Sequence, residues 1–89
     1  MPRVWETNPN MLIPYYLMFS YLYYEKNINL IDDTEFDTMC KTLLDKYDEL
    51  EHMHKDLVKK ESLTAGTGYD IKYTNMIKNS AMKLSEVWT

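Results

Sequence analysis

The chain has 89 residues, a single cysteine and a formal net charge of −4. This length allows one domain at most, and such a domain buries only roughly 60–65% of the surface that its unfolded chain exposes. One cysteine excludes an internal disulfide, and the negative charge argues against broad nucleic-acid binding through phosphate neutralisation. We therefore expect a small module that leans on a partner protein or on a second copy of itself.

The cellular setting is predicted from three further features. Residues 1–5 lack the basic-then-apolar layout of a secretory signal, and the longest apolar stretch, residues 11–24, is too short and too rich in tyrosine to span a bilayer. A lone cysteine fits a reducing compartment. We expect a cytoplasmic protein that does not insert in a membrane. Its eight tyrosines and two tryptophans favour a contact surface, because such side chains are enriched at interfaces.

The first predicted element is a helix over residues 14–26. Asn8-Pro9-Asn10 is a turn signal, and Pro14 suits the first turn of a helix because its missing N–H would be unpaired there. One apolar stripe is predicted from the helical spacing of Leu12, Tyr16, Phe19 and Tyr23.

A second helix is predicted to start after Asp32 and to end near Lys59. Asp32 stands three residues before Glu35, which is the spacing of a capping box. Apolar residues alternating by four and three positions predict a packing seam along this helix, formed by Phe36, Cys40, Leu43, Tyr47, Leu50, His54 and Leu57. Because the connector between the two helices is short, they are predicted to form an antiparallel hairpin.

The last third of the chain is predicted to be a loop followed by a short helix. Residues 62–68 contain both glycines and form the loop, and helical spacing then favours a helix over residues 70–83. Tyr69, Ile71 and Tyr73 also alternate as a strand would. The predicted fold class is all-α, an antiparallel helical hairpin with an additional short C-terminal helix. Residues 1–68 form the hairpin with its loop, and residues 69–89 form an extension that packs on the hairpin or on a partner.

Three segments in order resemble the small helical domain that begins NAD-dependent DNA ligases, and the likeness covers residues 20–68. Residues 21–24 are followed at the family's spacing by Asp33, Glu35, Phe36, Asp37 and Met39, which is similar to its Asp-x-Glu-Tyr-Asp-x-Leu signature. Residues 49–57 resemble the family's Glu-Leu-Glu…His-Pro-Glu-Leu segment after an insertion of about one helical turn. Residues 61–68 resemble its Asp-Ser-Pro-Thr loop, and residues 82–85 resemble the strand that opens the ligase catalytic domain, near the end of this chain.

The resemblance implies a site for the nicotinamide mononucleotide (NMN) half of NAD. In the ligases this domain closes over that half while a lysine of the next domain attacks the adenylyl phosphorus. By resemblance, the cofactor-binding residues are Tyr23, Tyr24, Asp33, Phe36 and Asp37. Phe36 would stack on the cationic pyridinium ring, and Asp33 would balance its charge or orient its amide. Tyr23 and Asp37 would contact ribose or phosphate.

The sequence departs from the family at several of these positions. Phe36 keeps a ring but lacks the usual hydroxyl, and Tyr24 stands where histidine is common. Asn27 and Asn29 replace the Asp and Pro of the family's turn, which softens the connector.

A purely structural interpretation of the same residues stays open. In this interpretation Phe36, which lies on the packing seam, is only a core residue. Asp32 and Asp33 only cap a helix, and the side chain of Tyr23 packs inside the domain.

Other chemistry has little support in the sequence. No metal site is expected, because His52 and His54 are two positions apart and would point to different sides of a helix. Cys40 on the seam is interpreted as a buried small hydrophobe.

These observations leave three hypotheses about function. No lysine begins a Lys-x-Asp-Gly motif, so no covalent adenylate of the ligase type can form, and we expect no catalysis by the chain alone. The first hypothesis is an accessory domain that supplies the NMN-binding lid to a separately encoded ligase catalytic subunit in DNA replication and repair. The second is a repurposed interaction or regulatory module, for example one that a phage encodes and that binds a protein in the host cytoplasm. The third is a free binder of NMN or NAD.

Overall fold

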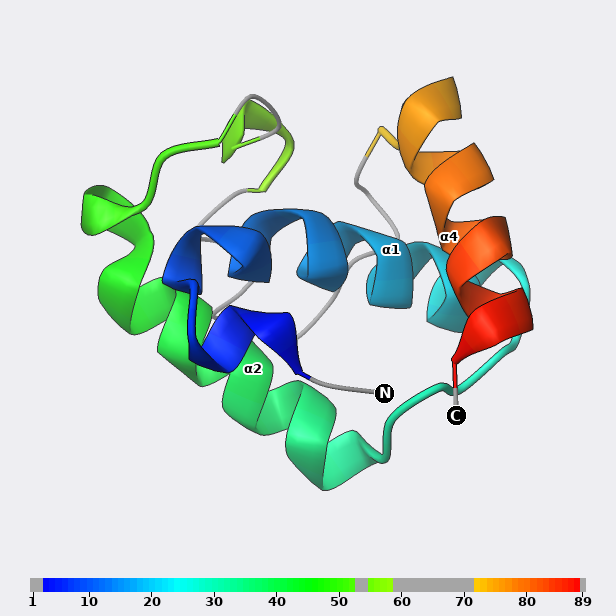
Figure 1. The fold of residues 1–89 in the computed structure, drawn as a ribbon, viewed down its shortest axis with the longest axis horizontal. Coiled ribbons are helices and arrows are strands. Elements are labelled where there is room, and N and C mark those ends of the chain that lie inside the picture. Colours follow the sequence, from blue (N-terminus) through cyan, green and yellow to red (C-terminus); the bar gives the residue numbers. More distant parts are fainter. Residues whose placement is uncertain (1–2, 53–54, 59–71, 89) are drawn as a thin grey trace.

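The computed structural model describes residues 3–52, 55–58 and 72–88. The α-helices of this part are α1 (Leu12–Glu25), α2 (Asp33–Lys46) and α4 (Asn75–Val87), with short 3-10 turns at Val4–Glu6, Pro9–Met11, Tyr47–Glu49 and Lys55–Leu57. None of the described residues lies in a β-strand. The fold is all-α, with α1 and α2 forming a helical hairpin and α4 added at the C-terminal end, as the sequence predicted (Figure 1). None of the helices described is long and apolar enough to cross a membrane.

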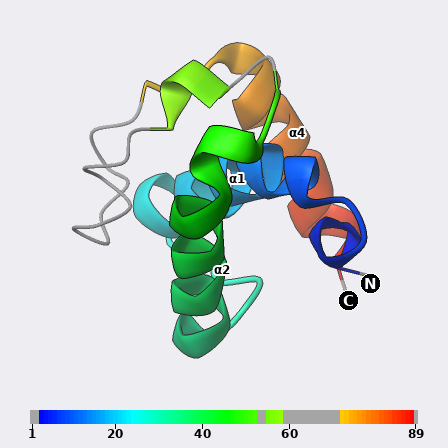
Figure 2. The same ribbon diagram turned by 90° about the vertical axis from the view of Figure 1, so that its left-hand side faces the viewer.

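Helix α1 is at the centre of the described part of the chain and packs against the other two α-helices described there (Figures 1 and 2). Every residue from Tyr16 to Leu22 is buried. The prediction of one apolar stripe was therefore too narrow, because this part of α1 is covered on all its sides, as befits a helix that is apolar all round. Tyr23, the last member of the predicted stripe, is 41% exposed.

Aromatic packing joins the first and last described turns of the chain across α1. The rings of Trp5 and Trp88 stack with centroids 6.3 Å apart and planes 9° apart, and Phe19 of α1 meets both rings edge-on. The guanidinium of Arg3 lies 5.6 Å from the centroid of the Trp88 ring. Much of the unusual aromatic content is thus used inside the fold, and Tyr23 is the one described aromatic residue that is classed as exposed.

The connector between α1 and α2 is fixed at both of its ends. Asn27 has a φ of 56°, in the left-handed region that asparagine tolerates, and the next amide, that of Ile28, donates to the Leu22 carbonyl at 2.8 Å. At the other end, the Asp32 carboxylate accepts a hydrogen bond from the Glu35 amide at 2.7 Å, so the Asp32 half of the predicted capping box is present. The Glu35 carboxylate binds the guanidinium of Arg3 and ties the N-terminal segment to α2.

The predicted end of the second helix near Lys59 was wrong. Helix α2 ends at Lys46, a 3-10 turn follows, and Leu50 is extended with its side chain 3% exposed in the core. A physical reason is the run of carboxylates at this end, on Asp45, Asp48, Glu49 and Glu51, because negative charge opposes the dipole at a helix C-terminus. The Tyr47 hydroxyl donates to the Val58 carbonyl at 2.7 Å and holds the following segment back against the helix end. His54 and Lys59 lie outside the described residues.

The third helix is shifted toward the C-terminus relative to its prediction over residues 70–83. It runs from Asn75 to Val87, and the Thr74 hydroxyl caps it by accepting from the Ile77 amide at 3.3 Å. Residues 82–85, which resemble a strand of the ligases, are helical here, so that part of the likeness does not extend to structure. The predicted loop at residues 62–68, the ligase-like residues 61–68 and most of the strand-like residues 69–73 lie outside the described residues.

Docking of α4 on α1 predicts a sharp contrast between two neighbouring side chains. Ile77 is 2% exposed and belongs to the core, whereas Met76 beside it is 55% exposed. Ile77→Ala should lower the free energy of unfolding by about 2–5 kcal/mol, while Met76→Ala should change it by less than about 0.5 kcal/mol. Urea unfolding followed by tryptophan fluorescence measures both values. Equal effects of the two substitutions would mean that α4 does not dock through this face.

Candidate functional site

Five residues predicted from the sequence line one open pocket between α1 and α2. We call it the rim pocket, and its lining consists of Tyr23, Tyr24, Asp33, Phe36, Asp37 and Cys40. The two tyrosines come from the last turn of α1, and the other residues come from the first two turns of α2. The left-handed Asn27 and the Asp32 cap set this juxtaposition, because together they turn the chain between the two helices. The pocket volume is about 300 Å³, at the lower end for ligand sites in proteins.

The aromatic side chains of the rim pocket form a small stack. The rings of Tyr23 and Phe36 lie nearly parallel, with planes 22° apart and centroids 6.2 Å apart. Tyr24 meets Tyr23 edge-on at 4.8 Å, and Phe36 rests on the buried Tyr16 at 5.9 Å. A third ring between Tyr23 and Phe36 would need a spacing of about 7 Å, so a planar ligand stacks on an open ring face or moves the exposed Tyr23 outward.

Two exposed carboxylates stand beside this stack, on Asp33 and Asp37. The carboxylate of Asp37 accepts from the Lys41 ammonium at 2.9 Å, one helical turn farther along α2. No ion pair of Asp33 with another described residue is present. An unneutralised carboxylate next to aromatic faces attracts a flat organic cation, because the ring quadrupole and the charge act in the same direction.

Cys40 was interpreted as core and not as a site residue, yet it also lines the rim pocket. Its spacing of four residues from Phe36 and seven from Asp33 on one helix was the signal that could have included it. The side chain is 6% exposed, and burial raises the pKa of its thiol from the ordinary 9.0 to about 12, with a smaller contribution from Asp37. A thiol held in its neutral form is a poor nucleophile, so Cys40 contributes shape to the pocket and not reactivity.

The purely structural interpretations of these residues have different outcomes. Tyr23 does not pack inside, because it is exposed. Asp32 caps α2, as the structural interpretation expects. Asp33 does not make that capping hydrogen bond, and its side chain lines the rim pocket. Phe36 is both core and site: it packs against the hydrophobic core and it also lines the pocket.

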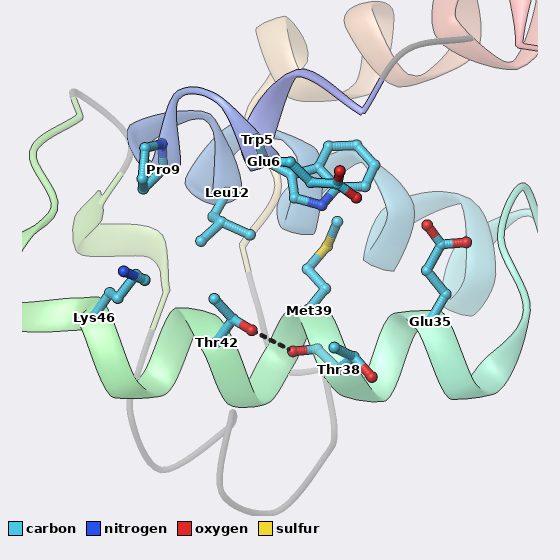
Figure 3. A pocket seen from close by; sticks show the side chains of 9 residues that line it. All are labelled: Trp5, Glu6, Pro9, Leu12, Glu35, Thr38, Met39, Thr42 and Lys46. Atoms are coloured by element: carbon cyan, nitrogen blue, oxygen red, sulfur yellow. Dashed lines mark hydrogen bonds between the residues drawn. The ribbon is translucent and has the colours of Figure 1, made fainter.

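A second pocket, which the sequence did not indicate, lies on the other flank of α2 (Figure 3). We call it the N-terminal pocket; it has a volume of about 310 Å³ and is lined by Trp5, Glu6, Pro9, Leu12, Glu35, Thr38, Met39, Thr42 and Lys46. Its floor is apolar, and three of its polar side chains are already engaged, since Thr38 donates to the Thr34 carbonyl, Thr42 donates to the Thr38 carbonyl and Glu35 binds Arg3. Trp5 lies outside every element that the sequence predicted, so no pattern placed it opposite α2.

The described part of the chain contains no cluster of three or more histidine, cysteine, aspartate or glutamate residues that could hold a metal ion. Comparison with protein-family models, curated protein sequences and solved structures finds no match for this chain.

Burial of Cys40 predicts how stability depends on pH. The thiol of the unfolded chain ionises as the pH rises through about 9, while the folded thiol stays protonated until about 12. The stability that this burial gives is therefore complete below about pH 9 and is lost progressively at higher pH. Between about pH 8 and pH 10, the wild type should lose more free energy of unfolding than Cys40→Ala, as measured by urea titration at each pH. Identical pH profiles would contradict the buried, neutral thiol.

Proposed function

We propose that the rim pocket binds the NMN half of NAD and that the chain acts as a lid for a separately encoded NAD-dependent ligase catalytic subunit. The observation that carries the proposal is that one pocket is lined by all five residues that the ligase resemblance implies as cofactor-binding, although they come from two helices. Their chemistry suits the ligand as well as their position does.

The aromatic faces and Asp33 match the cationic pyridinium ring of NMN. Stacking and cation–π attraction contribute about 0.5–2 kcal/mol, and a carboxylate at about 4 Å adds about 1–4 kcal/mol, depending on how far water is excluded. Hydroxyl groups of Tyr23 and Tyr24 can donate to ribose or phosphate oxygens. With the costs of association subtracted, an affinity of about 1 mM is expected for the chain by itself.

The openness of the rim pocket supports the role of a lid. A shallow pocket formed by one edge of a two-helix hairpin contacts only one side of a ligand, so a second surface has to enclose the other side. These 89 residues lack the Lys-x-Asp-Gly motif, and in this proposal the lysine that attacks the adenylyl phosphorus belongs to the separate catalytic subunit. In this proposal the chain orients the leaving NMN, and the partner performs the chemistry.

The contribution of the Phe36 ring is tested by calorimetric titration with NMN. Phe36→Leu keeps the apolar volume and removes the ring, and it should weaken binding about tenfold. Phe36→Tyr is the matched control and should bind within about twofold of the wild type, because it keeps the ring and restores the hydroxyl of the ligase pattern. If wild type releases no heat at millimolar NMN, or if Phe36→Leu binds as well as Phe36→Tyr, the proposed site is wrong.

The role of a lid is tested by adding the chain to an NAD-dependent ligase from which the first domain has been removed. We expect the chain to restore formation of the lysine–adenylate with NAD, because it returns the group that holds NMN for departure. Phe36→Leu should restore much less, whereas Thr42→Val in the N-terminal pocket should restore as much as the wild type. If a saturating concentration of the chain restores no lysine–adenylate formation, the chain has no role in ligation, even if it binds NMN.

A further inference from the structure

We propose that Lys41 makes the rim pocket selective for the phosphorylated nucleotide over its nucleoside, by exchanging the Asp37 carboxylate for the ligand's phosphate. The proposal rests on the proposed function, since it concerns how the same pocket distinguishes NMN from nicotinamide riboside. Lys41 is not one of the residues that the ligase signature supplied.

The geometry places the Lys41 ammonium beside a carboxylate that lines the rim pocket. Its nitrogen lies 2.9 Å from a carboxylate oxygen of Asp37, and Asp37 lines the pocket. The two residues are four positions apart on α2, so they lie on neighbouring turns of the same face. The side chains are 77% and 63% exposed, which leaves the ammonium free to turn toward a ligand in the pocket opening.

Charge gives the reason for such a contact. The pocket has two carboxylates in its lining, and a phosphomonoester carries a charge of about −1.5 to −2 at neutral pH. Without a cation nearby, the features that attract the pyridinium ring would repel the phosphate of the same ligand. Among the described residues, Lys41 is the cation that forms an ion pair with a carboxylate lining the rim pocket. The nucleoside has no phosphate, so its binding gains no affinity from Lys41.

Exchange of partners is feasible because the existing ion pair is weak. Exposed pairs at this helical spacing contribute little to stability, since solvent screens them and two long side chains have to be ordered. A phosphate group has more charge and more acceptor oxygens than a carboxylate, so it competes well for the same ammonium. A purely structural role for Lys41, as a surface partner of Asp37, would change stability slightly and leave the preference between the two ligands untouched.

The test is calorimetric titration of the full chain with NMN and, separately, with nicotinamide riboside, at low and at high salt. The wild type should bind NMN about three- to tenfold more tightly than the riboside at low salt, and the preference should shrink at high salt. Lys41→Gln should lose that preference without weakening riboside binding, and Lys41→Arg should retain it. Lys78→Gln on α4 is the matched control, because it makes the same change in net charge on another helix, and it should behave as the wild type.

The outcomes separate this inference from the proposed function. If neither ligand binds the wild type, the proposed function fails and the role of Lys41 fails with it. If both ligands bind but the wild type shows no preference for NMN, or if Lys41→Gln weakens both ligands equally, the role of Lys41 is overturned while nicotinamide recognition stands. Inorganic phosphate is titrated in parallel: if it competes with NMN for the wild type but not for Lys41→Gln, this supports phosphate contact at Lys41.

Discussion

Burial of the middle of α1 is the constraint on which the rest of the structure depends. Residues Tyr16 to Leu22 are apolar or small on every side of the helix and are covered on every side. A helix of this kind gains stability only if other segments surround it, so α2, α4 and the N-terminal segment are all required to complete the core. A chain of 89 residues has few large apolar side chains with which to cover such a helix. This requirement explains why Trp5 and Trp88, which are far apart in the sequence, both pack against Phe19.

The candidate site is a consequence of how α1 and α2 have to be joined. Helix α1 ends where its apolar sequence ends, and its last turn projects Tyr23 and Tyr24 beyond the covered region. The turn at Asn27 and the cap at Asp32 then start α2 beside that turn, with Phe36 facing inward and Asp33 and Asp37 facing outward. An aromatic stack with two carboxylates therefore arises at the open edge of the hairpin. In the proposed function, that combination binds the pyridinium ring and leaves one side of NMN uncovered for a partner.

Local sequence patterns predicted which helices form better than they predicted the lengths and packing of those helices. The Asp32–Glu35 spacing located the start of α2 because a cap is a contact between near neighbours. The end of α2 was missed because apolar spacing continues through Leu50 and Leu57, although these residues reach the core from non-helical backbone and from a separate turn. The N-terminal pocket was missed because only the tertiary fold brings Trp5 and Met39 to the same pocket. The five residues that the ligase resemblance supplied line one pocket because a short connector brings together residues that are close in sequence. Cys40 was omitted because its place on the predicted seam suggested only a packing role.

The most direct test of this account is a heteronuclear NMR titration of the isotopically labelled chain with NMN. We expect the amide shift changes to concentrate at the end of α1 and the start of α2, around Tyr23, Asp33, Phe36 and Asp37, with little change along the N-terminal pocket or α4. Shift changes centred on Trp5 and Met39 would place the ligand in the other pocket. Their absence throughout the spectrum at millimolar NMN would contradict nicotinamide recognition by this hairpin.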